Sequence, residues 1–306
     1  MRSSLPETFT VRAATPDDAE AVAELLRTTE LAARGSSLAA VQDMRDWWRM
    51  IDLPTASWLI VEGERLVAAG MLSTLREDGD FWGFVHPSEK GRGLGTALLE
   101  RAEEATQALG KRVLHAGTYS EDAEAAALLN ARGYRDVRHY FGMKIELDGP
   151  LAPPVWPDGI RADTIGRDEA RAFKDALDEA FADEWGWEPM EYDEWKRFRL
   201  DAPDTNLDLW FVARDEKELA AVARCEANRW GGGWVGAIGV RPHWRRRGLG
   251  LALLRHAFAE FHRGGERVVR LGVDAQNPTG ATRLYERAGM HVESEDVVYE
   301  KSLVTG

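Results

Sequence analysis

Apolar residues at helical spacing follow a Gly-rich loop at two places in the chain. In the second half they recur every three or four residues from Leu249 to Phe261, and in the first half from Leu94 to Ala102. This period predicts an amphipathic helix directly after each loop. The apolar positions are Leu249, Leu253, Leu254, Ala257, Phe258 and Phe261 in the second half, and Leu94, Leu98, Leu99 and Ala102 in the first.

Short runs of β-branched and aromatic residues come before both loops. Ile238 and Val240 stand before the second loop, and Phe84 and Val85 before the first. Each run ends two residues before a Pro, which cannot donate a hydrogen bond to a sheet and so predicts the end of a strand. The expected order at both places is strand, Gly-rich turn, helix.

The two loops belong to a longer repeat. Residues 85–105 match residues 240–260, so that Gly93 corresponds to Gly248, 155 residues later. Farther along, residues 128–134 match residues 284–290 at an offset of 156. Two ordered matches at nearly one offset indicate a duplicated domain rather than a short-period solenoid.

The rest of each half follows the same plan. An extended segment leads into a helical pattern at residues 9–30 and again at residues 159–181. Strand-like segments then follow in both halves. Four prolines among the twelve residues Asp148–Gly159 predict a stiff, extended linker. We therefore expect domains at residues 1–149 and 158–306.

Composition limits the compartment and the partners. The first residues hold two acids by Asp17 and no apolar core of a signal peptide, and no segment has the length needed to span a bilayer. Cys225 is the single cysteine, so no internal disulfide forms, and we expect a cytoplasmic protein. A formal net charge of −13 argues against a nucleic-acid partner and is compatible with an amine substrate.

The second loop has the chemistry of an anion site. A helix start leaves its first N–H groups unpaired, and Gly248 and Gly250 put no Cβ between the backbone and an approaching anion. Arg245, Arg246 and Arg247 cluster directly in front. A phosphate or pyrophosphate is the natural guest. Spacing excludes the dinucleotide and P-loop motifs, because the expected third Gly is Leu253 and no G-K-[ST] follows.

The run RRRGLG at Arg245–Gly250, with NPTGATRLYERAGM at Asn277–Met290 downstream, resembles the GNAT superfamily of acyl-CoA-dependent N-acyltransferases. The resemblance covers both halves. It implies two tandem α/β (α+β) domains, each a mixed, mostly antiparallel sheet flanked by helices, and acetyl-CoA as cosubstrate. It also implies the cofactor-binding residues, which are Ile238, Val240, Arg245, Arg246, Arg247, Gly248, Leu249, Gly250 and Asn277 in the second domain, and Val85, Lys90, Gly91, Arg92, Gly93, Gly95 and Thr96 in the first.

The two copies differ where the family places its general acid. The resemblance assigns this role to Tyr285, and a phenol is able to protonate the departing thiolate of coenzyme A. In the first copy the corresponding residues are Leu129 for Tyr285 and Glu121 for Asn277. Leu donates no proton. We expect catalysis in the second domain and a degenerate first domain.

The general base is open. Many members of the family carry a Glu on the strand before the loop, but residues 234–240 hold no acid. Glu226 and Glu184 are the candidates, each acting through water, and an amine that arrives neutral needs no base. No metal site is expected.

Grouped tryptophans follow the first helix of the second half. Trp185, Trp187 and Trp195 lie in the segment that forms the acceptor-site wall in this family, and Trp230 and Trp234 flank three glycines. With acidic neighbours they favour an amine on a bulky or aromatic body.

The sequence therefore predicts an N-acetyltransferase that transfers acetyl from acetyl-CoA to a small-molecule amine by direct attack, as a monomer or homodimer. Mycothiol synthase is an alternative with the same tandem layout, although the missing strand carboxylate counts against it. An antibiotic-modifying or a protein-acetylating enzyme fits the residues equally well. A non-catalytic acyl-CoA sensor or scaffold is a different class of alternative, against which the retention of Tyr285 and Asn277 argues.

Overall fold

The computed structural model describes residues 5–304 and divides into two compact units. The first holds the described residues up to His139 together with those from Glu295 on, and the second is Tyr140–Ser294. The divisions thus fall between His139 and Tyr140 and between Ser294 and Glu295, whereas the sequence predicts one boundary between residues 149 and 158.

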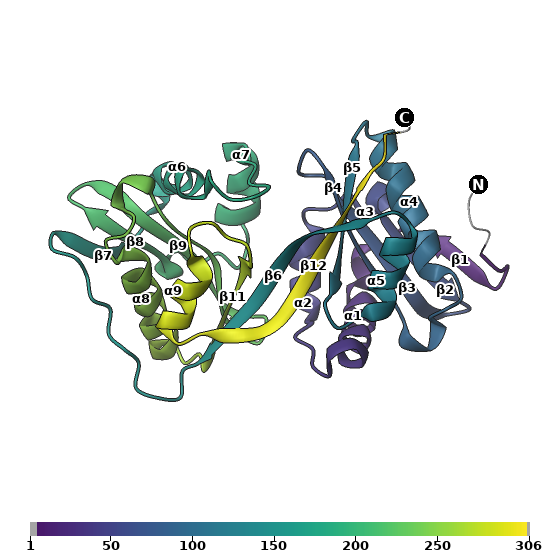
Figure 1. Ribbon diagram of the computed structural model, residues 1–306, viewed down its shortest axis with the longest axis horizontal. Coiled ribbons are helices and arrows are strands. Elements are labelled where there is room, and N and C mark those ends of the chain that lie inside the picture. Colours follow the sequence, from purple (N-terminus) through teal and green to yellow (C-terminus); the bar gives the residue numbers. More distant parts are fainter. Residues whose placement is uncertain (1–4, 305–306) are drawn as a thin grey trace. The chain divides into compact units, whose positions relative to one another are not determined.

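The first unit is a six-stranded sheet with helices packed on it (Figure 1). Its strand order is β1-β2-β3-β4-β5-β12, and only β4 and β5 are parallel. The strands are β1 (Phe9–Arg12), β2 (Ser57–Glu62), β3 (Arg65–Ser73), β4 (Gly79–Val85), β5 (Val113–Tyr119) and part of β12 (His291–Ser302). The helices are α1 (Ala19–Arg34), α2 (Val41–Trp48), α3 (Leu53–Ala56), α4 (Leu94–Ala108) and α5 (Ala123–Ala131).

The second unit repeats this plan in the order β7-β8-β9-β10-β11-β6, with β10 and β11 as its parallel pair. The mixed, mostly antiparallel sheet expected for each half is confirmed. The strands are β7 (Ile160–Thr164), β8 (Trp210–Asp215), β9 (Glu218–Arg229), β10 (Gly232–Val240), β11 (Val268–Asp274) and part of β6 (Arg135–Glu146). The helices are α6 (Ala170–Phe181), α7 (Tyr192–Trp195), α8 (Leu249–Arg263) and α9 (Ala281–Ala288).

The two repeats exchange their final strands. Asp296–Ser302 of β12, from the second repeat, pair antiparallel with β5 of the first unit. Tyr140–Glu146 of β6, from the first repeat, pair antiparallel with β11 of the second unit. Each sheet is thus completed by a strand that the other repeat supplies.

Both faces of the second sheet are buried, because its strands carry apolar residues on both sides. On β9, Ala221 and Ala223 face the core under α8 and α9, whereas Val222 faces the core under α6 and α7. The apolar stripe predicted for α8 is buried as expected, with Leu253, Leu254 and Phe258 at most 2% exposed. Each such side chain contributes roughly 1.5–3 kcal/mol of burial.

Candidate active site

The parallel strands β10 and β11 separate soon after they begin. Their register holds only Gly233 opposite Val269 and Trp234 opposite Arg270, although β10 runs on to Val240. A shift in register between Val235 and Ala237 bends β10 at this point. The later residues of β10 therefore present unpaired backbone groups toward β11, which an extended ligand with amide groups is able to pair. The predicted residues Ile238 and Val240 lie on this stretch.

The chain passes from β10 through the basic loop into α8. Gly248 has a φ of +88° and precedes the helix without any side-chain cap. A Cβ placed on Gly248 would meet no atom within 4 Å, so open space faces the uncapped N–H groups of the first turn. Backbone donors and the helix dipole favour an anion at this point.

Gly250 serves packing instead. A Cβ at this position would lie 2.9 Å from Cδ1 of Leu284, so the glycine allows α8 and α9 to approach each other closely. The sequence predicts that Gly250 opens the backbone to an anion. In the structure the side of Gly250 that lacks a Cβ faces Leu284 on α9 instead. Gly95 of the first domain is placed in the same way, 2.8 Å from Cδ2 of Leu128.

The three loop arginines have different surroundings. Arg245 donates to Asp183 Oδ2 at 2.7 Å and to the carbonyl oxygens of Ala180 and Val240 at 3.1 and 3.2 Å, which braces the loop against the end of α6. Arg247 lies 3.7 Å from Asp215. Arg246 has a φ of +62° and no carboxylate partner among the described residues. Arg246 and Arg247 are therefore the cations most open to a bound anion.

Tyr285, Glu184 and Asn277 come together in the second domain. Asn277, in the loop after β11, donates to Glu184, in the segment after α6. Tyr285 on α9 is 8% exposed, and burial together with the nearby charge of Glu184 raises the pKa of its phenol well above the usual range. Such a phenol keeps its proton at neutral pH, as a general acid must. The structure thus gathers three of the residues that the sequence singled out.

Glu226 lies in a different environment. On β9 it is ion-paired with Arg224 and with Arg229, at 3.4 Å in the second case. The two arginines bind the carboxylate of Glu226. The charge of Glu184, by contrast, acts on the phenol of Tyr285. Glu184 is therefore the better placed of the two candidate bases.

The tryptophans of the second domain have different surroundings. Trp195 is buried in the core under α6 and α7, with its ring 5.7 Å from that of Trp210. Trp187 packs at 4.8 Å on Phe181. Trp234 lies on β10 beside the point where the strands separate. Trp195 is therefore a core residue and not an exposed part of a pocket wall.

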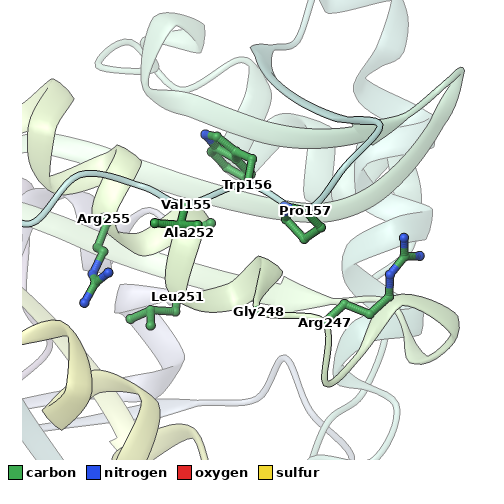
Figure 2. Close-up of a pocket in the computed structure, with 8 residues that line it drawn as sticks. All are labelled: Val155, Trp156, Pro157, Arg247, Gly248, Leu251, Ala252 and Arg255. Atoms are coloured by element: carbon green, nitrogen blue, oxygen red, sulfur yellow. The ribbon is translucent and has the colours of Figure 1, made fainter.

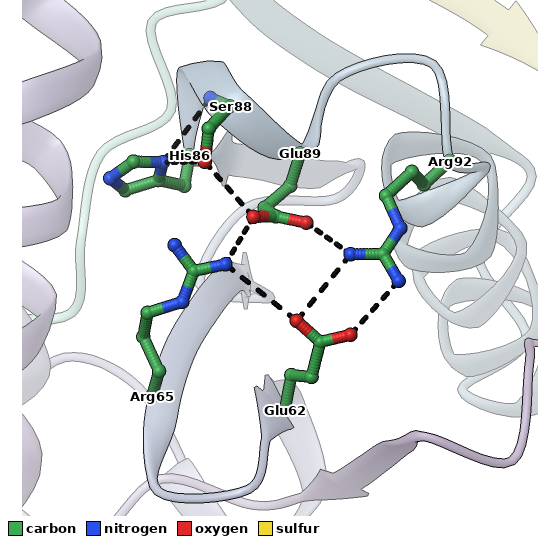
Figure 3. Close-up of polar contacts among 6 residues, drawn as sticks. All are labelled: Glu62, Arg65, His86, Ser88, Glu89 and Arg92. Atoms are coloured by element: carbon green, nitrogen blue, oxygen red, sulfur yellow. Dashed lines mark hydrogen bonds and ion pairs between the residues drawn. The ribbon is translucent and has the colours of Figure 1, made fainter.

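The loop of the first domain has the same backbone but another charge balance. Gly91 and Gly93 both have positive φ, like Arg246 and Gly248. Its cations, however, are matched by acids within the same domain (Figure 3). Arg65 and Arg92 each bind both Glu62 and Glu89, and Lys90 binds Asp122 at 3.2 Å and Glu124 at 2.9 Å.

These acids change what the first loop is able to hold. The two cations of the first loop face four carboxylates, whereas the three arginines of the second loop face Asp183 and Asp215 among the described residues. A pyrophosphate at the first loop would have to displace or lie beside these carboxylates, which repel it. Sequence reasoning missed Glu62, whose partnership with the loop depends on strand pairing. The pairing of Glu89 with Arg92 could have been predicted from the sequence, because Glu89 lies three residues before Arg92.

The first domain has no phenol at the position that corresponds to Tyr285. Leu129 on α5 is buried at the position that matches Tyr285.

A polar cluster lies at the end of β5. Tyr119 donates to Glu30 Oε1 at 2.9 Å, and the Arg34 guanidinium lies 4.3 Å above the Tyr119 ring. Burial raises the pKa of Asp296 beside them to about 6. Tyr119, Glu30, Arg34 and Asp296 thus form a polar cluster beside the end of β5.

The network at Glu89 predicts a pH-dependent stability. Hydrogen bonds from Arg65, Arg92 and Ser88 lower the pKa of Glu89 to about 2 from an ordinary value of 4.5. A lowered pKa stabilises the fold above pH 4.5, and this contribution is lost as the pH falls toward 2. We expect Glu89→Gln to lower the melting temperature at pH 7 and this difference to shrink as the pH drops below 4.5. Thermal unfolding of both proteins across pH 2.5–7 measures it, and a difference independent of pH would contradict the ionic role.

Residues 5–304 contain neither a candidate metal site nor a candidate membrane-spanning helix. No group of three or more His, Cys, Asp or Glu side chains is arranged to hold a metal ion. None of the helices within that range has the length and apolarity to cross a membrane.

A splayed parallel strand pair that leads through a basic loop into an uncapped helix fits an acetyltransferase. The chain belongs to the acetyltransferase (GNAT) family, which it matches over residues 19–134 and 170–290. The two matches confirm the tandem arrangement.

Relatives and solved structures agree with this assignment. A mycothiol acetyltransferase of Thermobispora bispora is 34% identical over 233 residues, covering 71% of this chain and 74% of that protein. Another from Streptomyces avermitilis is 31% identical over 231 residues, covering 70% and 69%. A GCN5-related N-acetyltransferase from Sphaerobacter thermophilus is 33% identical, with a TM-score of 0.87 and coverage of 99% and 98%. A tandem GNAT protein of the clavulanic acid pathway, 18% identical over 97% and 99%, shares the fold with a TM-score of 0.76.

Proposed function

We propose that the second domain transfers acetyl from acetyl-CoA to an amine of a small molecule, and that the first domain takes no part in the chemistry. The placement of Glu184 and Asn277 around Tyr285 carries this proposal. The corresponding part of the first domain holds Leu129, which has no proton to give.

Cofactor binding is assigned to the second domain on the charge balance of its loop. The pyrophosphate would meet the N–H groups that follow Gly248, with Arg246 and Arg247 as cations, and Arg245 would hold the loop in place through Asp183. The unpaired edge of β10 at Ile238 and Val240 would accept the amide-bearing arm of the cosubstrate.

The reaction is a direct displacement. The amine nitrogen bonds to the thioester carbonyl carbon, and collapse of the tetrahedral intermediate breaks the carbon–sulfur bond. Tyr285 gives its phenolic proton to the departing thiolate, while the proton of the attacking amine leaves through water or Glu184. Solvent then restores the phenol.

A ping-pong route through the single cysteine is disfavoured. Cys225 on β9 is 1% exposed in the core under α8, and burial raises the pKa of its thiol far above the usual value. A buried thiol is a poor nucleophile because the thiolate is the reactive form.

The second candidate acceptor is the substrate of the mycothiol acetyltransferases. The 34% identity with the Thermobispora bispora protein favours it, and the matched segment spans most of both chains. The missing carboxylate on β10 then has to be replaced by Glu184 acting through water.

Amine-dependent release of the coenzyme A thiol tests the function. We expect release with a primary amine, with the mycothiol acetyltransferase substrate as one member of the panel, and an N-acetylated product by mass spectrometry. The Cys225→Ala enzyme should keep the wild-type rate and no acetyl-enzyme should accumulate. No release with any amine, from a protein that binds acetyl-CoA, would instead support the sensor alternative.

A further inference from the structure

Arg224 on β9 places a cation on the face of the second sheet that α6 and α7 cover. Val222, two residues earlier, is buried in the core under these helices, and alternate residues of a strand share a face. Cys225 points to the other face, toward α8. The pocket beside the Gly248 loop also lies along α8 (Figure 2). Arg224 therefore lies on the face where the segment with Glu184 begins, and not on the face of α8.

The guanidinium of Arg224 lies against the point where β10 bends. A Cβ placed on Gly236 would be 2.6 Å from Nη2 of this guanidinium. Gly236 falls in the shift of register between Val235 and Ala237. Trp234 is the last residue of β10 that pairs with β11. The guanidinium thus lies where the two parallel strands separate.

The end of α6 covers the same strand a few residues farther on. A Cβ on Gly239 would lie 2.7 Å from Cβ of Ala180, so the last turn of α6 packs directly on β10. The segment that carries Glu184 therefore starts about 10 Å along the strand from Gly236, the length of three extended residues. Under the proposed function, the arm of the cosubstrate follows β10 back from the loop and brings its thioester to this stretch.

Arg224 has two donors that no described residue uses. Glu226, two residues along β9, binds Nη1 of Arg224, and no other partner of this guanidinium occurs in residues 5–304. The Arg224 side chain is 12% exposed. The remaining edge holds Nε and Nη2, whose parallel N–H bonds match the two oxygens of a carboxylate. This edge is therefore suited to one further negative charge on this face.

The cation is particular to the second domain. Arg224 lies opposite Ala237, and the equivalent pair in the first sheet is Met71 opposite Trp82. Met71 is fully buried in the core of the first unit, where it accepts a hydrogen bond from Trp48. The same strand position thus holds a core residue in one copy and a partly exposed guanidinium in the other.

We propose that Arg224 binds a carboxylate of the acceptor, so that the substrate is an amine that also carries a carboxyl group, as amino acids do. The inference rests on the proposed function and names the substrate class of that site. Glu184 suits the ammonium group of such a zwitterion, and the guanidinium suits its carboxylate. Trp234, which lies opposite Glu226 on the same face, offers a flat apolar surface to the rest of the molecule.

Acetylation of three matched acid and amide pairs tests the assignment. The acids are phenylalanine, leucine and 6-aminohexanoate, and thiol release compares each with its primary amide. Wild type should prefer the acid of at least one pair in kcat/KM. Arg224→Met should reduce this preference about tenfold or more, the effect of losing one charged hydrogen bond. Because both enzymes are given the same two amines, the difference in amine basicity cancels. Arg224→Lys, which keeps the charge but not the paired N–H groups, should fall between them.

Two further variants distinguish binding from a loss of structure. Arg224→Met combined with Glu226→Ser installs the Met and Ser of the first repeat and leaves no unpaired carboxylate, and it should lose the preference like the single variant. Arg214→Met on β8 is the matched control, because the Arg214 side chain is also 12% exposed and ion-paired with acids. It should keep the wild-type preference. A wild type without preference for the acid in any pair, or an Arg224→Met enzyme that keeps the preference, would overturn the assignment.

A competition measurement needs no variant. The acids 3-phenylpropanoate, 4-methylpentanoate and hexanoate are the three acceptors without their amines. The one that matches the preferred acceptor should compete with it, and its primary amide at the same concentration should not. Absence of inhibition by the acid, or equal inhibition by the amide, would overturn the proposal. No thiol release with any amine, whether acid or amide, would instead contradict the proposed function itself.

Discussion

Replacing Gly248 with Asp is expected to weaken acetyl-CoA binding strongly and to lower turnover with it. The Asp carboxylate would stand in open space in front of the first turn of α8, where the pyrophosphate should lie. Loss of a charged hydrogen bond together with the added repulsion corresponds to a weakening on the order of 10²-fold or more. Calorimetry and thiol release measure the two effects.

Two variants separate the causes. Gly248→Asn has the same shape without the charge and tolerates the left-handed backbone equally well, so it should fall between wild type and Gly248→Asp. Gly93→Asp makes the identical change in the first domain, where four carboxylates already surround the loop cations, and it should bind and turn over like wild type. Equal losses from folded Gly93→Asp and Gly248→Asp proteins would contradict a single active domain.

Tyr285→Phe should lower kcat on the order of 10²-fold or more while the affinity for acetyl-CoA stays nearly unchanged. The substitution removes the proton donor and leaves the buried ring. Because burial and Glu184 raise the pKa of this phenol, its titration should give no falling limb in the neutral range. The wild-type rate should therefore keep rising toward the pKa of the amine, about 10 for an alkylamine.

Single-turnover kinetics, in which chemistry limits the rate, provide the measurement. Tyr299→Phe is the control and should keep the wild-type rate, because it removes a phenol that is likewise buried but lies in the first compact unit. An unchanged rate in Tyr285→Phe under these conditions would remove Tyr285 from the mechanism.

Sequence reasoning was strongest where the chemistry is local. The order of strand, loop and helix around Gly248 depends on residues adjacent in the chain, and the helix at Leu249–Arg263 begins directly after that glycine. The resemblance to the GNAT family located Tyr285 and Asn277 without any knowledge of contacts. Their meeting with Glu184 could be anticipated only in outline, because it depends on how the segment after α6 returns over the sheet.

What the sequence left out are contacts between distant residues. Nothing near Arg92 in the sequence indicates that Glu62 will bind it, because strand pairing brings Glu62 there. The brace from Arg245 to Asp183 joins residues 62 positions apart. The burial of Trp195 against Trp210 could not be told from a pocket wall by composition, since both environments favour aromatic rings.

The exchange of strands between the repeats has a consequence for synthesis on the ribosome. Residues 113–119 of β5 pair with residues 296–302. The first sheet therefore cannot add this last strand until the second repeat has been synthesised. The second sheet, by contrast, takes its edge from residues 140–146, which emerge before the rest of it. The domain translated first is therefore the one completed last, and until then its β5 edge is exposed to wrong partners.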